Sequence, residues 1–432
     1  MMGSLGHLLV GLIDDIMVGR LGPVELAATS LGNSLIFIAL SIGIGFSFAI
    51  TPLIAESDGE GDKEKGRSVF QHGIILMTIL GIAIFGLLLV IKPILYHLDQ
   101  PEEVVALAIP YYEIVAISMI PLMVFQGLKQ FTDGLSETKY AMYATILTNV
   151  VNVLLNFALI YGLWIFPRLE IVGAALGTLF SRIIMVIFLF VVLSKREKFA
   201  TYMRRLALYE VKKKVFNKLI GLGFPTALQM LFEVGLFTTS VLLAGTLGAF
   251  PQAANQIALK LASTTFMIAV GIGVASTVRV GNQKGLRNYV ELRRIAFSNF
   301  LLILIIMFSF SIGFVLLKDT LPWVFTDNLE VIAIASSLLI IAGLFQLSDG
   351  LQAVILGGLR GLQDVKWPSI LSFIAYWIIG FPISYFLGKE EVLGTLGIWI
   401  GLLVALTSSA IMLFFRFNYL SNKLIKEKNE LT

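Results

Sequence analysis

The chain has 432 residues and a formal net charge of +4; 57% of its residues are hydrophobic, only 14% are charged, and the mean hydropathy is +0.89. A soluble protein carries roughly a quarter charged residues, so this composition excludes an ordinary soluble domain. The absence of cysteine and the presence of only three histidines exclude disulfides, thiol nucleophiles and Cys/His zinc clusters. The small net charge gives no reason to expect a nucleic-acid partner.

Twelve apolar blocks follow one another along the chain, and most are long enough for the roughly 20 residues that a helix needs to cross a bilayer. Because they show no strand-like alternation, they predict an all-α integral membrane protein with twelve transmembrane helices. The first block barely reaches the minimum length, which indicates a first helix clipped at its start. The blocks cover residues 3–19, 30–54, 73–91, 104–127, 141–165, 171–194, 218–246, 253–279, 295–317, 329–356, 368–388 and 393–415.

A basic interval at residues 195–217 separates the sixth block from the seventh. It predicts a cytoplasmic linker between an N-terminal six-helix bundle (1–194) and a C-terminal one (218–416), followed by a cytoplasmic tail (417–432). Lysine and arginine gather in the even-numbered loops and in the tail, whereas each odd-numbered loop holds one. By the positive-inside rule, we expect both termini in the cytoplasm of a bacterium, with the helices in its inner membrane.

The two predicted bundles share short sequence patterns. The Leu-Gly and Ala-Ala pairs of residues 21–28 recur at 247–254, and the Gly-Leu-x-acid-x-Lys pattern of residues 134–139 recurs at 361–366. Six helices per copy is an even number, so both copies cross the membrane in the same direction. The pattern therefore predicts a parallel internal repeat, as in other repeat-built transporters.

Polar residues inside the second-half blocks point to an ion site. Thr226, Gln229 and Glu233 share one face of the predicted seventh helix, and Gln346, Asp349 and Gln352 form a similar stripe in the tenth. Intramembrane charges are costly and mark function by default. Two carboxylates flanked by amide oxygens could coordinate Na⁺, or a desolvated carboxylate could carry a proton. Alternatively, Glu233 forms a structural ion pair with Lys260.

The first half contains a weaker set of the same kind. Asp14 lies in the first block, and Asn152 and Asn156 lie on one face of the fifth. These residues could support a cation site, or they could form the interhelical hydrogen bonds that polar residues commonly make in membrane bundles.

Aromatic and methionine side chains in the second half could line an apolar cavity for flat organic cations through stacking and cation–π contacts. Most such residues in a membrane protein face lipid, so each assignment is a hypothesis. The candidates are Met230, Phe232, Phe237, Phe266 and Phe345.

Three segments resemble a known family. Residues 13–19 (Ile-Asp-Asp-Ile-Met-Val-Gly), residues 131–139 (Phe-Thr-Asp-Gly-Leu ahead of a lysine) and residues 359–366 (Leu-Arg-Gly-Leu-x-Asp-x-Lys) are similar to motifs of the multidrug and toxic compound extrusion family. The Phe-Glu-Val of residues 232–234 resembles its NorM-like branch in particular. The resemblance covers essentially the whole chain.

This resemblance implies a V-shaped pair of six-helix bundles around a central cavity. It also implies that Glu233 and Asp349 form a second-half cation site and that Asp14 is the first-half acidic residue. The sequence departs from relatives at two positions. Asn156 stands where some relatives have aspartate, and Phe345 stands where several have tyrosine, so the choice of coupling ion stays open.

We expect a secondary antiporter that exports cationic or amphiphilic small organic molecules in exchange for Na⁺ or H⁺, without a cofactor and as a monomer. The alternative is a lipid-linked saccharide flippase of related architecture, but such a protein needs a cationic cavity, whereas the intramembrane charges here are mostly acidic. An enzyme is not expected, since no nucleophile–base pair, metalloprotease motif or phosphate-cradling loop is present.

Overall fold

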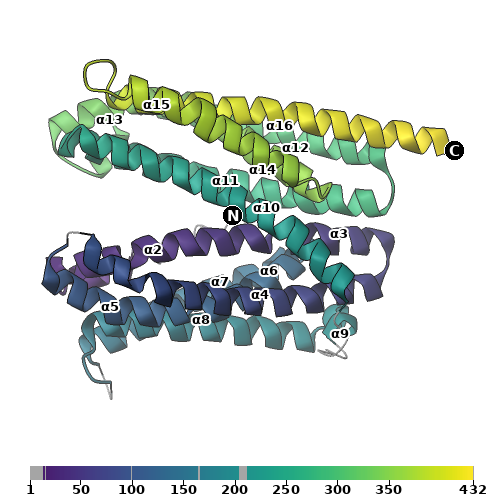
Figure 1. Ribbon diagram of the computed structural model, residues 1–432, viewed down its shortest axis with the longest axis horizontal. Coiled ribbons are helices and arrows are strands. Elements are labelled where there is room, and N and C mark those ends of the chain that lie inside the picture. Colours follow the sequence, from purple (N-terminus) through teal and green to yellow (C-terminus); the bar gives the residue numbers. More distant parts are fainter. Residues whose placement is uncertain (1–12, 15, 99, 164–165, 204–211, 432) are drawn as a thin grey trace. The chain divides into compact units, whose positions relative to one another are not determined.

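The computed structural model describes residues 13–14, 16–98, 100–163, 166–203 and 212–431 of the chain (Figure 1). Within these ranges every regular element is helical, and eleven spans are long and apolar enough to cross a membrane. The predicted all-α membrane fold is therefore confirmed. Most of the predicted first helix lies outside the described residues.

The chain divides into two compact units between Ala227 and Leu228. This division falls inside α10 (Lys213–Thr246), whereas the sequence suggested a boundary in the basic interval before that helix. The first turns of α10 pack with the N-terminal unit because Gly223 brings the helix against the ring of Phe46, where a Cβ atom would lie only 2.9 Å from the ring. The basic interval is therefore not the point at which the two units separate.

The N-terminal unit consists mostly of long helices, and two of its membrane-length spans are interrupted. The span from residue 102 to residue 134 is broken at Ser118, whose hydroxyl donates to the Val115 carbonyl. Helices α4 and α6 pack together, as do α7 and α8. The elements before α10 are α2 (Pro23–Ser47), α3 (Ile50–Glu60), α4 (Lys63–Ile91), the 3-10 helix η1 (Lys92–His97), α5 (Glu102–Ile117), α6 (Met119–Gly134), α7 (Thr138–Tyr161), α8 (Glu170–Lys195) and α9 (Glu197–Met203).

Helix α9 lies inside the segment that the sequence marked only as a basic linker. Its Phe199 and Tyr202 are buried, and their rings lie 6.1 and 5.3 Å from the ring of Phe131 on α6. These aromatic contacts anchor the short helix against the bundle. The many lysine and arginine residues around these two aromatic residues made the segment resemble a polar linker, so the sequence did not predict this helix.

An ion network around Glu137 joins α9 to the start of α7. The ammonium of Lys198 donates to Glu137 Oε1 at 2.8 Å, and Lys139 lies 3.1 Å from Oε2. The hydrogen bond from Lys198 is the main reason that the pKa of Glu137 lies below its ordinary value of 4.5. The network therefore makes its full contribution to stability at pH values above 4.5, the ordinary pKa of the group. This contribution is lost as the pH falls through the lower pKa of Glu137 in the folded protein.

We expect Glu137→Gln to lower the unfolding free energy by about 1 kcal/mol or less at pH 7, the range for partly exposed ion pairs. Thermal unfolding in detergent should show the variant and the wild type converging in acid, below the folded-state pKa of Glu137. Glu427→Gln is the matched control, since its ion pair with Lys423 is half exposed and spans 3.6 Å. Equal effects of the two substitutions at pH 7 would contradict the prediction.

The C-terminal unit is built around α13, which packs against α11, α12 and α16. Figure 1 shows α16 running along α15, and the two helices are in contact. The span from residue 366 to residue 387 changes from α to π geometry and back. The elements after α10 are α11 (Ala249–Gly285), α12 (Tyr289–Leu316), the 3-10 helix η2 (Leu321–Val324), α13 (Leu329–Gly361), α14 (Lys366–Phe373), the π-helix η3 (Ile374–Gly380), α15 (Phe381–Leu387) and α16 (Thr395–Leu431).

Helix α16 continues through the segment that was predicted as a separate tail. The guanidinium of Arg293 on α12 donates to Asn418 Oδ1 and to Ser421 Oγ, both at 2.6 Å. These bonds tie the polar end of α16 to the neighbouring helix, so the polar composition of residues 417–431 does not end the helix.

The closest approach of α11 and α13 depends on Gly357. A Cβ atom at this position would overlap the carbonyl oxygen of Gly273, and Thr277 Oγ1 donates to the Gly357 carbonyl at 2.9 Å.

We expect Gly357→Ala to destabilise the protein by about 1–3 kcal/mol, as overpacking does. The control is Gly313→Ala on α12, where a Cβ atom meets open space. A melting temperature for Gly357→Ala equal to that of this control would contradict the prediction.

Candidate functional site

Buried and partly buried polar side chains from four elements of the C-terminal unit gather in one region, which we call the polar cluster; Glu233 and Arg360 are the partly buried members. Three members lie on one face of α13, at i, i+3 and i+6, and they are Gln346, Asp349 and Gln352. All three are at most 5% exposed. The full membership is Gln229 and Glu233 of α10, Gln346, Asp349, Gln352 and Arg360 of α13, Tyr376 of η3, and Ser409 of α16.

Electrostatic interactions connect Arg360, Glu233 and Asp349 at the centre of the polar cluster. Arg360 Nη2 donates to Gln229 Oε1 at 3.2 Å, and the same guanidinium attracts the carboxylate of Glu233. Glu233 in turn acts on Asp349, and the hydroxyl of Tyr376 lies within the electrostatic reach of both carboxylates. The two acids predicted as a cation site therefore do lie in one electrostatic neighbourhood.

The polar cluster holds an unusual concentration of buried polar atoms without a hydrogen-bond partner among the described residues. Four atoms have none, and they are Gln229 Nε2, Gln346 Oε1 and Nε2, and Asp349 Oδ1. Tyr376, by contrast, forms side-chain hydrogen bonds with Ser409 and Gln352. Leaving one such atom unpaired costs about 1–3 kcal/mol, so four in one place indicate a binding site for a polar ligand. Two of the four are oxygens, the atoms that hard cations prefer.

The charge count of the polar cluster favours a single monovalent cation. With every group ionised, Glu233 and Asp349 supply two negative charges and Arg360 supplies one positive charge. One negative charge is left in excess, and a buried net charge is strongly disfavoured. One Na⁺ or one proton would make the cluster neutral.

The π-helix η3 contributes Tyr376 to the cluster. The wide turn is closed by the amide of Phe381, which donates to the carbonyl of Tyr376 five residues earlier. Tyr376 is fully buried, while the neighbouring Trp377 donates its indole N–H to the Phe232 carbonyl at 3.3 Å. Stretches of π geometry inside α-helices are frequently found at functional sites.

Sequence reasoning missed three members of the polar cluster. Tyr376 was missed because an apolar, aromatic stretch of sequence contains no pattern that predicts a π turn. Arg360 lies beyond residue 356, where the tenth apolar block was taken to end, although α13 continues to Gly361. Ser409 closes a run of three hydroxyl residues at 407–409, and that run was a signal within an otherwise apolar span.

Two expectations about neighbouring residues are changed by the structure. Lys260 is exposed and forms no ion pair with Glu233 among the described residues, so the predicted structural pair is wrong. Phe345 is 1% exposed and packs between the rings of Phe237 and Trp399, in the core of the unit.

The remaining cavity candidates are partly buried. Phe232 packs on Phe373 at 5.0 Å, and Phe266 packs against a second core cluster. Met230 is also partly buried. The assignment of these side chains to a substrate cavity stays a prediction.

The N-terminal unit contains a separate polar network around Asp14. Asn156 Nδ2 donates to Asp14 Oδ1 at 2.7 Å and approaches Asn152 Oδ1 at 3.4 Å, and Asn152 Nδ2 lies 3.5 Å from Ser181 Oγ. The structure therefore brings together the three residues that the sequence singled out. Unlike the polar cluster, this network satisfies most of its own polar atoms, as interhelical hydrogen bonding would.

The described residues form eleven membrane-length helices in two units, and each unit places a carboxylate among polar partners within these helices. These are features of a polytopic membrane transporter. Residues 1–158 and 225–386 match the protein family described as MatE. The chain belongs to this family, and it is a multi-pass membrane transporter rather than an enzyme.

Similar proteins extend over nearly the whole chain. It is 34% identical over 427 residues to a "Probable multidrug resistance protein NorM" of Rhizobium meliloti, covering 96% of this chain and 90% of the relative. It is 30% identical over 430 residues to "Multidrug resistance protein NorM" of Photobacterium profundum, covering 97% and 93% respectively. A solved structure described as "Crystal structure of MATE in the bent conformation" shares the fold, with a TM-score of 0.90 at 23% identity, covering 99% of this chain and 94% of that one.

Proposed function

We propose that this protein is a secondary antiporter that exports cationic or amphiphilic small organic molecules in exchange for one Na⁺ or H⁺, which binds in the polar cluster. The observation that carries the proposal is the set of four buried polar atoms at and around Asp349 that have no hydrogen-bond partner among the described residues. The relatives named multidrug resistance proteins support the choice of organic cargo.

The energetics favour exchange over simple release. Moving one positive charge out of a negative cell interior costs about 2.3 kcal/mol per 100 mV. Admitting one Na⁺ or proton for each exported cation cancels that electrical term. Cargo and coupling ion would compete for Glu233 and Asp349, so that binding of one releases the other.

The wider arrangement follows from the same proposal. We infer a monomer in the bacterial inner membrane, with both termini in the cytoplasm and two helical bundles that alternate access to a central cavity. The distribution of lysine and arginine among the loops supports this orientation.

The test uses proteoliposomes loaded with ethidium, a fluorescent organic cation. A Na⁺ gradient is imposed at constant pH, and then a pH gradient is imposed without Na⁺. Ethidium movement driven by one of the two gradients supports antiport and names the ion. Silence under both gradients would point to a narrow substrate or to a lipid-linked saccharide flippase. Cargo binding unchanged in the Glu233→Gln/Asp349→Asn double variant would show that the competition model is wrong.

A further inference from the structure

A cavity of about 550 Å³ lies within the N-terminal unit, at the ends where α4 and α10 begin. It has no part in the polar cluster of the C-terminal unit. Two of the residues that line it are acidic, Asp62 and Glu64. The cationic lining residues are Lys65, Arg67, Lys212, Lys214 and Lys218.

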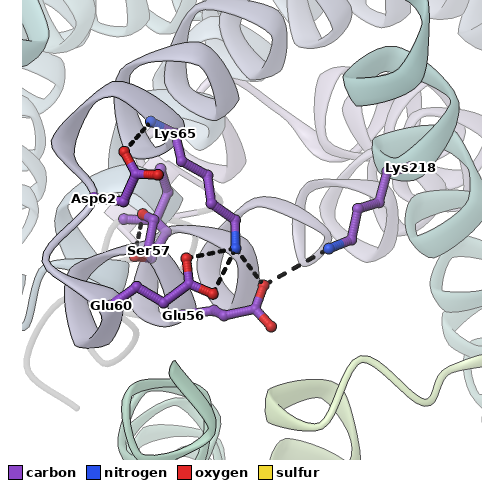
Figure 2. Close-up of polar contacts among 7 residues, drawn as sticks. Glu56, Ser57, Glu60, Asp62, Lys65 and Lys218 are labelled. Atoms are coloured by element: carbon purple, nitrogen blue, oxygen red, sulfur yellow. Dashed lines mark hydrogen bonds and ion pairs between the residues drawn. The ribbon is translucent and has the colours of Figure 1, made fainter. Parts of the chain in front are cut away.

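Part of this positive charge is already neutralised by acids in and around the cavity. Figure 2 shows the ammonium of Lys65 between Glu56 and Glu60, at 3.2 and 2.7 Å, with Lys218 reaching the same Glu56 at 3.7 Å. Arg67 pairs with Glu64 at 2.8 Å.

The remaining two cations keep their charge available. Within the described part of the chain, the side chains of Lys212 and Lys214 form no ion pair. Both are exposed where they line the cavity. An anion entering the cavity would therefore meet two positive charges that no carboxylate of the described residues occupies.

The start of α10 adds to this attraction. Helix α10 begins at Lys213, and residues of its first turn line the cavity. The first amide groups of a helix have no acceptor inside the helix, and its N-terminal end carries a partial positive charge. At the start of α4, the carboxylate of Asp62 already accepts a hydrogen bond from the amide of Lys65 at 2.9 Å. The end of α10 beside Lys212 and Lys214 is therefore the one that suits a phosphate group.

His72 connects the starts of α4 and α10 beside the cavity. The amide of Lys212 donates to His72 Nε2 at 2.7 Å, so the imidazole proton lies on Nδ1, which donates to the Ser68 carbonyl at 2.7 Å. This bridge holds the start of α10 against α4. The side-chain hydroxyl of Ser68 also lines the cavity, and its oxygen is buried without a partner among the described residues.

We infer that this cavity, the α4–α10 pocket, binds the phosphate group of an anionic phospholipid. A lipid is favoured over a soluble phosphate because both helices that form the pocket are membrane-length and begin there, which sets the pocket at the boundary between water and hydrocarbon. Basic pockets between transmembrane helices on the cytoplasmic side recognise such headgroups. The inference rests on the orientation proposed above but not on antiport, so it can fail or succeed independently of the transport assay.

The experiment measures lipid binding to the purified full-length chain by native mass spectrometry and by thermal unfolding in detergent. Phosphatidylglycerol, phosphatidylcholine and inorganic phosphate are added separately. We expect phosphatidylglycerol to bind most tightly. The Lys212→Gln/Lys214→Gln variant should bind it about 30-fold more weakly, since each lysine near an anionic surface is worth about 1 kcal/mol.

Two further variants separate this site from general attraction between the chain and anionic lipid. Lys423→Gln/Lys426→Gln removes the same number of charges from α16 and should leave binding unchanged. Lys212→Arg/Lys214→Arg keeps both charges and should retain binding. Three results would overturn the inference. The α16 control could weaken binding as much as the pocket variant does, or the wild type could bind phosphatidylglycerol no better than phosphatidylcholine. The third is displacement of the lipid by millimolar inorganic phosphate.

Discussion

Asp349→Asn is expected to remove cation-driven efflux while leaving the protein folded. The substitution keeps the shape of the side chain but takes away the excess negative charge of the polar cluster. Losing one charge-assisted contact is worth about 1.5–3 kcal/mol, which corresponds to roughly 10- to 100-fold weaker binding of the coupling ion. The measurement is ethidium movement under a Na⁺ gradient and under a pH gradient, together with the ion dependence of thermal unfolding.

Stability separates this result from misfolding. Asp349 is 5% exposed and its Oδ1 has no hydrogen-bond partner among the described residues. Replacing a poorly satisfied buried carboxylate by a neutral amide should not lower the melting temperature. Asp319→Asn is the matched control, because Asp319 is an exposed acid whose one ion-pair partner among the described residues is its neighbour Lys318. Efflux at the wild-type rate in Asp349→Asn would exclude this carboxylate from coupling.

Arg360→Gln is expected to destabilise the protein by about 1.5–3 kcal/mol, the range for losing a hydrogen bond made by a charged group, here the bond from Arg360 to Gln229. The polar cluster would then hold two negative charges without an internal counter-charge. Adding Glu233→Gln should recover most of the loss, because the second substitution removes the carboxylate that Arg360 attracts. Thermal unfolding of both single variants and the double variant gives the coupling directly.

The same variant makes a prediction about ions. Because its cluster carries one more uncompensated negative charge, Na⁺ should raise the melting temperature of Arg360→Gln more than that of the wild type. The Arg360→Gln/Asp14→Asn double variant is the control for the recovery of stability, since Asp14 belongs to the hydrogen-bonded network of the N-terminal unit. Recovery by Asp14→Asn as large as that by Glu233→Gln would contradict the assigned pairing.

The sequence was sufficient for the membrane fold because crossing a bilayer demands long apolar helices. It was less informative at helix ends, where polar residues belong to the helix but not to the apolar block. Helix α3 runs on to Glu60 and α16 runs on to Leu431, past the predicted ends at residues 54 and 415. In α16, the bonds from Arg293 show that a polar segment can stay helical by hydrogen bonding to a neighbour.

The polar cluster was partly predictable for a related reason. Glu233 and Asp349 stood out because ionisable residues inside apolar blocks are rare, and their amide neighbours followed from helical spacing. Tyr376 did not stand out, since a tyrosine in an apolar block resembles an ordinary packing residue. Its contribution depends on a local departure from α geometry, and helical spacing cannot reveal such a departure.

The π-helix η3 also has a consequence for how this chain can change in length. Removing one residue from an α-helix rotates everything beyond it by about 100° relative to the side chains before it. Within residues 374–380, a one-residue deletion can instead be absorbed as the wide turn narrows to an ordinary one. The helix on either side would keep its packing, while Tyr376 would leave the cluster. This segment is therefore a place where evolution can remove an oxygen from the cluster without rebuilding the bundle around it.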